Sequence, residues 1–531
     1  MSEPDSRRRL MRRLSDPTTV AALVAVAVAV AVGVALRYRY YTAIEPGPDS
    51  DEAEFGLLAQ QLLRGELPLL MRGQPYGGTP WLFGIALSIR AFGMNVFALR
   101  LPTVFVGLVN AGIAFGIGRQ LLWSKRRALL AAACVWCFPM AAVFFASRET
   151  MYFVPAVTAG LGTIFIILRM EHRRSPSELM GSEAMSRKSL LAAGLVTGIG
   201  LWINPGSLYL TAPALLWLGW RILREAWQLS EGVARRVASV LRPISQIVIG
   251  VVLGAFPLLF ITLAGTPRRN NYFDREGFSF ADRAQLFGRQ QLPGWFGFRV
   301  PIGGFTEGAW LGGWPWKVGF LLFFALLLFQ ILRKSSTANE SLLSWVAAAV
   351  PILFLLVTLR TGPVYANLRY VFFASPVLAL LVGSKWRKDW QAVVALGLLP
   401  LIGLAGMSNF DFARQSTLAP TVKLLKDRGA KCAIGDYWAG GHRLMFESQE
   451  EIISISTYEN RNPLYIDQAE DLGNCPWVFF DGTPTAAQFE QYLASKQISV
   501  EAVRPGDGRV VYFPERRVWL EDLYPDSVPG S

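Results

Sequence analysis

The feature that most constrains this chain is a series of long apolar blocks. A helix of about 20 apolar residues spans the ~30 Å hydrocarbon core of a bilayer. Only 17% of the residues are charged, below the roughly 25% that is usual for soluble domains. The sequence therefore predicts a polytopic α-helical membrane protein with about eleven transmembrane helices. The blocks cover residues 18–36, 96–122, 129–146, 151–168, 190–203, 207–222, 244–263, 316–332, 342–359, 370–382 and 392–407.

Charges outside the blocks predict how the chain is inserted. Basic clusters occupy alternate loops, at 119–127, 169–188, 221–242, 333–334 and 385–388. Because cytoplasmic loops are enriched in Lys and Arg, eleven spans with a cytoplasmic N-terminus put every cluster inside and the C-terminal tail outside. This places the protein in the cytoplasmic membrane as a multi-pass protein. The same distribution accounts for the net charge of +13 without a nucleic-acid partner.

The first block is expected to stay in the mature protein. Arginines precede it, as in a secretory signal, but its apolar run is about 19 residues long and no small-residue cleavage site follows. We therefore interpret it as a membrane anchor.

Two domains are expected. The first, residues 1–410, is the membrane domain, with outer loops at 37–95 and 265–314. The second, residues 411–531, is a small extracytoplasmic α/β domain, since short apolar strands alternate there with helical segments. Strands are predicted at 432–435, 452–456, 477–480, 500–503 and 510–513, and helices at 419–428, 437–446 and 486–496. Cys432 and Cys475 each open a predicted strand, and the sequence leaves open whether they form a disulfide.

The first outer loop predicts two helices. One begins near Ser50, which can cap it, and an apolar stripe that includes Leu57, Leu58 and Leu62 suggests that it lies on the membrane surface. The second, over 81–92, is too short to span the bilayer, so an interfacial helix is expected.

Carboxylates near the membrane are the strongest indication of chemistry. Residues 45–54 hold Glu45, Asp49, Asp51, Glu52 and Glu54. Helix-dipole stabilisation would explain some of them. However, Glu149 lies in a short outer turn between two blocks, so two acidic groups from separate elements are expected to meet at one end of the bundle. Such a pair indicates a general base or a metal clamp.

Cations and polar side chains also gather in outer segments. The loop 265–314 is rich in arginine and aromatic residues, which fits either an aromatic belt with solvated arginines or a site for an anionic lipid headgroup. Arg369 and Tyr370, before the tenth block, could bind the same group or anchor the chain at the interface. Only two histidines occur, so a histidine-built metal site is not expected.

Several short motifs together resemble the GT-C-fold glycosyltransferases, in particular bacterial relatives of protein O-mannosyltransferases and the lipid A aminoarabinose transferase. They are Asp51-Glu52 after the first span, Gly78-Thr79-Pro80-Trp81-Leu82, Phe92-Gly93, Arg100-Leu101-Pro102, and Arg369-Tyr370 followed by Pro376. The resemblance covers residues 1–410. One departure matters: several relatives have Lys-Pro-Pro where this chain reads Gly78-Thr79-Pro80, so another cation must contact the donor phosphate here, or the donor differs.

The resemblance implies a function and a set of residues for it. Members of the group transfer a sugar from a polyprenyl-phosphate carrier to an acceptor outside the cytoplasmic membrane, usually with inversion. It leaves open whether the acceptor is a protein, a lipid or a glycan, and a divalent cation is possible but not required. The implied catalytic residues are Asp51 as base, Glu52 and Glu149. The implied donor-phosphate ligands are Arg369, Tyr370, Arg268, Arg269 and Arg289. The implied substrate-binding residues are Glu54, Tyr76, Arg148, Asn204, Tyr365 and Asn367.

Two other functions remain as alternatives. A lipid or glycan transporter or flippase would carry polar residues near the bilayer midplane, whereas charges within the blocks of this chain are nearly absent. A non-catalytic member of a cell-envelope glycan assembly would keep the fold without needing the carboxylate pair.

Overall fold

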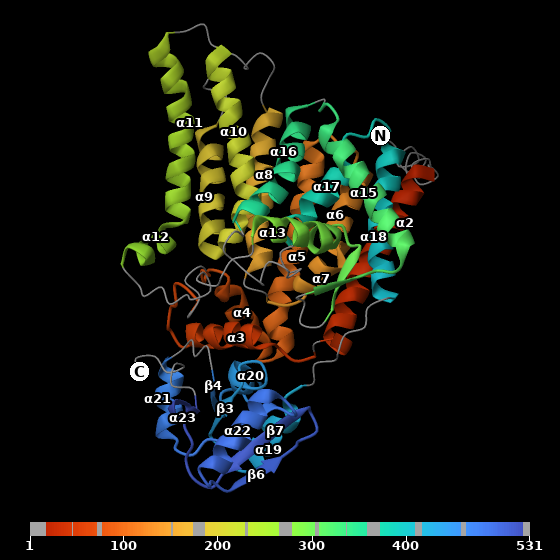
Figure 1. Ribbon diagram of the computed structural model, residues 1–531. Helices are drawn as coiled ribbons and strands as arrows, with labels where there is room; N and C mark the ends of the chain where they lie inside the picture. Colours follow the sequence, from red (N-terminus) through yellow and green to blue (C-terminus); the bar gives the residue numbers. More distant parts are fainter. Residues whose placement is uncertain are drawn as a thin grey trace, which may run out of the picture.

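The computed structural model describes residues 17–44, 46–71, 77–149, 152–173, 186–228, 232–264, 279–302, 307–335, 337–357, 372–408, 417–457 and 463–523. Its helices form a bundle, two short helices lie across one end of that bundle, and a small α/β unit lies beyond them (Figure 1). The residues that approach each other at this end come from both the beginning and the end of the chain.

Seven of the described helices are long and apolar enough to cross a membrane. These are α2 (Pro17–Arg39), α5 (Val96–Gln120), α8 (Phe153–Arg173), α11 (Val233–Gly254), α15 (Trp314–Leu332), α16 (Ala338–Val357) and α18 (Asp389–Ser408). The remaining bundle helices are α6 (Lys125–Cys137), α7 (Met140–Phe145), α9 (Arg187–Ile203), α10 (Leu208–Gln228), α12 (Phe256–Leu263) and α17 (Ser375–Gly383). The multi-pass helical architecture is thus confirmed, whereas the count of eleven spans stays a prediction.

One block is interrupted for a local reason, and two other blocks form helices that are short for a span. Block 129–146 is divided between α6 and α7 at Phe138–Pro139, because proline cannot donate the backbone hydrogen bond that would continue a helix. Helix α9 has 17 residues and α17 has 9. Helix α9 packs closely on α11, and a Cβ on Gly194 or Gly198 would overlap backbone atoms of α11.

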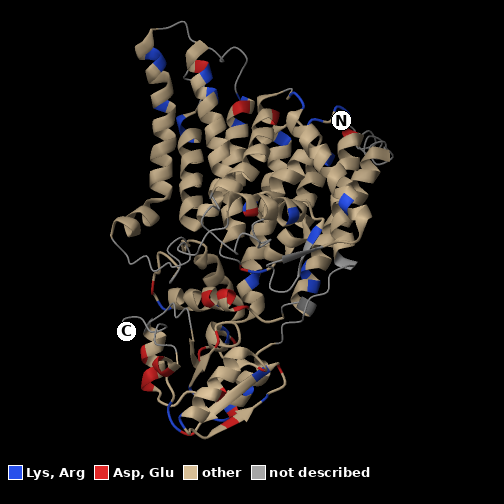
Figure 2. Cartoon of the chain, in the orientation of Figure 1, with Lys and Arg blue, Asp and Glu red and all other residues tan. Residues whose placement is uncertain are grey.

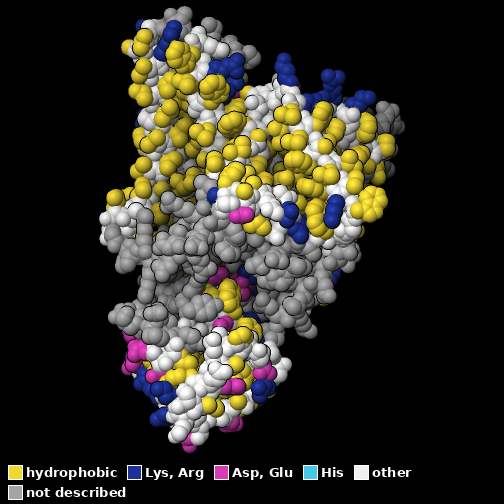
Figure 3. Space-filling view, viewed as in Figure 1, with side chains coloured by type: hydrophobic (Ala, Val, Ile, Leu, Met, Phe, Trp, Pro, Cys, Tyr) yellow, Lys and Arg dark blue, Asp and Glu magenta, His cyan; other side chains and the backbone are white. Residues whose placement is uncertain are grey.

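Hydrophobic side chains cover the visible face of the bundle, and Lys and Arg side chains gather at the end away from the α/β unit (Figures 2 and 3). An apolar face of this kind suits a lipid environment. The opposite end carries α3 (Ser50–Leu63) and α4 (Leu82–Phe92), which lie side by side. The predicted second helix of the first outer loop therefore exists, and its 11 residues are too few for a span.

The second outer segment also folds onto the bundle. It comprises α13 (Phe280–Leu286), η6 (Phe287–Gln291), α14 (Leu292–Trp295) and a hairpin of β1 (Arg299–Ile302) and β2 (Glu307–Trp310). Trp295, Phe296 and Phe298 are buried in the core of the bundle. The interpretation of this segment as an aromatic belt is therefore wrong for these three side chains, because they pack against Phe320 and Phe354 instead of facing an interface.

The C-terminal unit, residues 417–457 and 463–523, contains a five-stranded sheet in the order β4-β3-β5-β7-β6. Strands β3 (Cys432–Gly435), β4 (Ile453–Ser456) and β5 (Trp477–Phe480) are parallel, and β7 (Arg509–Pro514) runs antiparallel to β5 and to β6 (Val500–Val503). The helices are α19 (Ala419–Asp427), α20 (Gly441–Glu447), α21 (Pro463–Asp471), α22 (Pro484–Ser495) and α23 (Leu520–Leu523). A disulfide joins Cys432 to Cys475, which settles a pairing that the sequence left open.

The ends of β4, β7, α19 and α22 differ from the prediction by one or two residues, and two differences are larger. Helices α21 and α23 are absent from the prediction. The helix expected from residue 437 begins at Gly441, because Asp436 accepts hydrogen bonds from the backbone N–H groups of Trp438 (3.0 Å) and Ala439 (3.3 Å) and holds the chain in a turn.

Candidate active site

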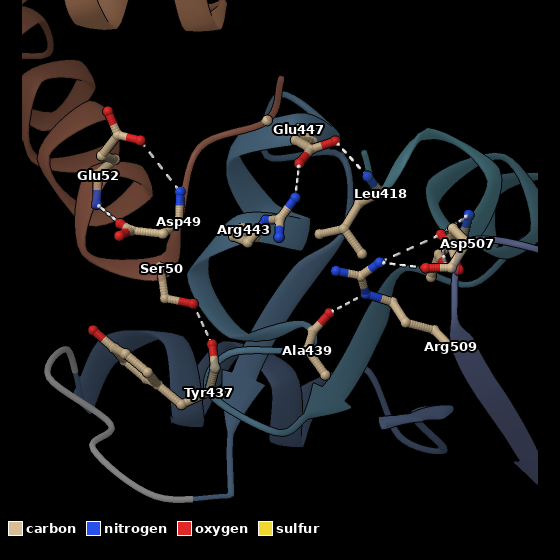
Figure 4. A network of polar contacts seen from close by, with 12 residues as sticks. Asp49, Ser50, Glu52, Leu418, Tyr437, Ala439, Arg443, Glu447, Asp507 and Arg509 are labelled. Atoms are coloured by element: carbon tan, nitrogen blue, oxygen red, sulfur yellow. Dashed lines mark hydrogen bonds and ion pairs between the residues drawn. The ribbon is translucent and has the colours of Figure 1, made fainter. Parts of the chain in front are cut away.

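Helix α3 begins with a reciprocal pair of hydrogen bonds. The Asp49 carboxylate accepts from the backbone N–H of Glu52 at 2.8 Å, and the Glu52 carboxylate accepts from the backbone N–H of Asp49 at 3.3 Å (Figure 4). Asp49 is therefore the N-cap, and the prediction of Ser50 as the cap is wrong. The Ser50 hydroxyl instead donates to the carbonyl oxygen of Tyr437 in the C-terminal unit.

Glu52 is completely buried and holds α3 against the bundle. The guanidinium of Arg100, on α5, donates to both carboxylate oxygens at 2.9 and 2.6 Å and also to the carbonyl of Gly47 at 2.8 Å. The backbone N–H of Glu149 donates to Glu52 at 3.2 Å. A buried two-point Arg–carboxylate pair fixes the geometry of both side chains and neutralises the charge. Glu52 therefore joins α3 to α5 and to the α7–α8 turn.

Glu149 lies in the turn between α7 and α8 and is almost completely buried. Its carboxylate accepts hydrogen bonds from Trp81 Nε1 (2.9 Å), Thr103 Oγ1 (2.7 Å) and the backbone N–H of Tyr152 (2.9 Å). Burial raises the pKa of Glu149 to about 7, although these hydrogen bonds oppose the shift. The structure thus brings Glu149 beside Glu52, as the predicted convergence of the two segments requires.

Asp51 and Glu54 face the other way, toward the C-terminal unit. The hydroxyl of Tyr437 donates to Asp51 Oδ1 at 2.8 Å, and Nδ1 of His442 lies 3.1 Å from Glu54 Oε2. All four of these side chains are buried. The candidate base Asp51 therefore lies where the bundle and the C-terminal unit meet.

The apolar stripe of α3 packs against protein on both sides. Leu57 belongs to the hydrophobic core of the C-terminal unit, while Leu58 belongs to the core of the bundle. The prediction that α3 lies at the membrane surface stays a prediction.

Two predicted substrate-binding residues have local structural partners. Arg148 forms an ion pair with Asp49, the N-cap of α3. Asn204 Oδ1 accepts from the backbone N–H of Gly206 at 2.7 Å and caps η4 (Pro205–Ser207). Arg289 is exposed on η6. The other predicted residues fall outside the described ranges: Glu45, Tyr76, Arg268, Arg269, Tyr365, Asn367, Arg369 and Tyr370.

The departure at Gly78 has a packing explanation. The backbone N–H of Gly78 donates to the carbonyl of Ile203 at 3.1 Å, and a Cβ at this position would overlap the carbonyl oxygen of Trp202. A lysine could not occupy this place without moving the end of α9.

Two buried donors on the second outer segment were not singled out in the sequence from the other arginines and aromatic residues of that segment. Arg283 Nη1 and Trp295 Nε1 have no hydrogen-bond partner among the described residues, although both side chains are buried. Buried donors normally find a partner. The density of arginine and tryptophan in this segment was visible in the sequence, but which of these side chains become buried was not.

An apolar cavity of about 260 Å³ adjoins this segment. Its walls combine side chains of the second outer segment with side chains of α15, α16 and α17: Phe287, Leu292, Trp295, Phe324, Leu327, Val350, Pro351 and Val377. Within the described ranges, by contrast, no three His, Cys, Asp or Glu side chains are placed to hold a metal ion together.

An aromatic cluster connects the cavity to the carboxylates. Ala374 lines the cavity, and the preceding Phe373 packs on Phe153 with ring centroids 5.3 Å apart. Phe153 directly follows Tyr152, which hydrogen-bonds Glu149 and packs against Phe55 of α3 at 4.5 Å. Phe373, Phe153 and Tyr152 thus link the cavity to Glu149 through contacts between neighbouring residues.

Comparison with solved structures shows which fold this is. The chain superposes on ArnT from Cupriavidus metallidurans bound to undecaprenyl phosphate with a TM-score of 0.56 and 13% identity, over 92% of this chain and 97% of that one. The apo form of the same protein gives 0.57 and 15%, over 93% and 98%. An Archaeoglobus fulgidus oligosaccharyltransferase in complex with Zn and sulfate gives 0.50 and 12%, over 93% and 72%. This chain has the GT-C fold.

The resemblance predicted from the short motifs is thus confirmed at the level of the fold. By sequence alone the chain matches no protein-family model and no curated protein. Fold without close sequence similarity does not transfer a function, so the argument for function must come from the site itself.

Proposed function

We propose that this protein is a membrane glycosyltransferase that moves a sugar from a polyprenyl-phosphate donor to an acceptor, with Asp51 as the general base. The observation that carries the proposal is the concentration of buried carboxylates at the end of a GT-C bundle, where α3, the α7–α8 turn and the C-terminal unit meet. Burying a carboxylate costs free energy unless it is hydrogen-bonded or ion-paired. The buried carboxylates here belong to two separate elements.

The chemistry follows from the charges. Asp51 takes the proton of the acceptor nucleophile as that atom forms its bond to the anomeric carbon. On the opposite face of the sugar the bond from the anomeric carbon to the phosphate oxygen breaks, and the polyprenyl phosphate leaves with the electron pair. A displacement of this kind inverts the anomeric configuration. The departing phosphate needs no proton, only cationic or hydrogen-bond stabilisation.

We assign the donor to the second outer segment. The cavity walls are almost wholly apolar, as an isoprenoid chain requires, and Arg283 lies one turn before Phe287, which lines that cavity. Arg283 and Trp295 supply buried donors for which the described residues offer no acceptor. A phosphate oxygen would satisfy them, and arginine suits this role because its guanidinium binds phosphate in two-point contacts. ArnT, with the same fold, has been crystallised with undecaprenyl phosphate.

We infer that the reaction takes place on the outer face of the cytoplasmic membrane. The Cys432–Cys475 disulfide belongs to an oxidising compartment, and the unit that carries it contacts Asp51 through Tyr437. Lys and Arg gather at the opposite end of the bundle, which the positive-inside rule assigns to the cytoplasm.

The test is release of undecaprenyl phosphate in proteoliposomes. Purified protein receives undecaprenyl phosphate linked to glucose, galactose, mannose or arabinose, with a membrane extract as acceptor source. We expect release from at least one donor, and Asp51→Asn should lower the rate about 10²- to 10⁴-fold, the usual worth of a general base. Asp389→Asn makes the same chemical change at the other end of the bundle, where Asp389 pairs with Arg126, and should leave the rate unaltered.

Two results would contradict the proposal in different ways. No release from any of the four donors would exclude this donor class, whereas full activity of Asp51→Asn would remove Asp51 as the base. In the same assay Arg283→Ala should raise the KM for the donor more than Arg289→Ala does, since Arg283 is buried one helical turn before Phe287, which lines the cavity, and Arg289 is exposed.

A further inference from the structure

Tyr437 of the C-terminal unit reaches the candidate base. Tyr437 lies in the turn between β3 and α20, is 1% exposed, and donates its hydroxyl to Asp51 Oδ1 at 2.8 Å. Its backbone carbonyl accepts from Ser50, the residue before Asp51. One residue of the C-terminal unit therefore contacts two consecutive residues of α3, which lie 386 residues away in the sequence.

From this we infer that Tyr437 is a positioning residue for Asp51, and that the active site is complete only when the C-terminal unit is docked on α3. The inference rests on the proposed function, because it takes Asp51 as the base. It adds a residue from outside the membrane bundle to the machinery of the reaction and gives the C-terminal unit a role in it.

The turn that carries Tyr437 is held rigidly from the sheet side. The backbone N–H of Asp436 donates to Val478 of β5 at 3.1 Å, and that of Gly440 donates to the Asp436 carbonyl at 2.9 Å. Arg509 on β7 donates from Nε to the carbonyl of Ala439 at 2.6 Å (Figure 4). The turn is thus tied to two strands on either side of Tyr437, so the position of the hydroxyl is set by the sheet.

The tyrosine ring itself is also confined. It packs edge-on against Trp438 and His442, with centroid distances of 4.9 and 5.9 Å. His442 in turn lies against Glu54 of α3. With the ring fixed on both sides, the hydroxyl can hold the Asp51 carboxylate in one orientation, and a hydrogen bond to an ionised acceptor is among the stronger ones that a neutral donor makes.

Docking of the unit on α3 is extensive enough to maintain this contact. Gly56 of α3 packs directly on the ring of Phe446, where a Cβ would overlap the ring. Gln61 donates from Nε2 to the hydroxyl of Tyr465 at 2.7 Å. The second of these contacts supplies a control, because Tyr465 is another buried tyrosine whose hydroxyl contacts α3. Its partner Gln61 lies about three helical turns from Asp51 along α3.

The experiment compares Tyr437→Phe with Tyr465→Phe in the proteoliposome assay with the undecaprenyl-phosphate sugar that the wild-type protein uses. Each substitution removes one hydroxyl and preserves the ring. We expect Tyr437→Phe to lower kcat about 10- to 100-fold, the worth of one hydrogen bond to a charged group, with the KM for the donor unchanged. Tyr465→Phe should stay within about twofold of wild type for both constants, since the hydrogen bond from Gln61 that it removes is neutral and far from the base.

A double variant separates positioning from docking. Once Asp51→Asn has removed the base, adding Tyr437→Phe should lower kcat little further. The effects of substitutions at residues that act through one another are not additive. An unchanged kcat in Tyr437→Phe would overturn the inference, as would equal losses in the two tyrosine variants, which would indicate a docking role alone. Either result is compatible with an inactive Asp51→Asn, so the inference can fail while the proposed function stands.

Discussion

The two ends of the helix bundle both bury charged side chains, but they use them differently. At the end away from the C-terminal unit, cations bind carbonyl oxygens near helix C-termini. Arg127 donates from Nε to Gly383 at 2.8 Å, at the end of α17, and Lys385 donates to Arg333 at 2.7 Å, just after α15. These contacts satisfy carbonyls that a helix end leaves without a partner.

At the α3 end several buried carboxylates lie close together, and their partners come from several elements. Arg100 on α5, the Trp81 and Thr103 side chains, and Tyr437 of the C-terminal unit all donate to them. Asp49 and Glu52 cap the start of α3, whereas Asp51 and Glu54 contact side chains of the C-terminal unit. The difference teaches that burial of charge alone does not indicate a site, and that acids gathered from distant segments are the better indication.

The largest expected effect in this comparison is loss of the Arg100–Glu52 pair. Arg100→Ala leaves Glu52 completely buried without its cation, which should lower the free energy of unfolding by about 3–5 kcal/mol. Thermal unfolding of the detergent-purified protein, followed by tryptophan fluorescence, would measure it. Arg64→Ala is the matched control, because Arg64 pairs with Glu450 at the exposed rim of the same interface and should contribute less than about 1 kcal/mol. Equal stability of the two variants would show that Glu52 does not hold α3.

A smaller effect should appear in the pH dependence of stability. The pKa of Glu149 is raised to about 7, so the folded state retains a proton that the unfolded state releases above the ordinary value of 4.5. Stability should therefore fall as the pH rises from 4.5 to 7, by at most about 3 kcal/mol, and then level off. Glu149→Gln should flatten this part of the curve. If the wild-type and variant curves ran parallel, Glu149 would not be the group responsible.

The smallest effect is expected at the opposite end. Arg127→Ala frees the Gly383 carbonyl and removes a cation that lies 4.4 Å from the ring centroid of Trp123. The loss should be about 2 kcal/mol of unfolding free energy, with kcat unchanged once the protein is folded. The unfolding free energy and kcat should be measured in the same preparation. A fall in kcat without a loss of stability would show that the two ends of the bundle are coupled.

Some features of this protein were predictable because they depend on local sequence. Each apolar block overlaps a helix, since hydropathy over about 20 residues is a local property. Strands β3, β5 and β6 begin and end at the predicted residues, because short apolar runs between polar turns indicate strands directly. The carboxylates of residues 45–54 could also be recognised, because their density is a local property of the sequence.

Other features depend on which segments meet, and the sequence left them undetermined. Ser50 looked like the cap of α3, but a capping-box partner made Asp49 the better acceptor and turned Ser50 toward Tyr437. In the sequence, Gly78 was recognised only as a position where several relatives have lysine. The structure shows that the end of α9 occupies the space that a side chain at this position would need.

The sequence by itself determined that this chain forms apolar helices, an acidic segment after the first of them and an α/β tail, because hydrophobic burial and local turn chemistry act over a few residues. Only the tertiary structure decided that α3 lies between the bundle and the tail, and that Tyr437 reaches Asp51 across 386 residues. The physical reason is that packing two buried surfaces together selects one arrangement among many with the same local pattern.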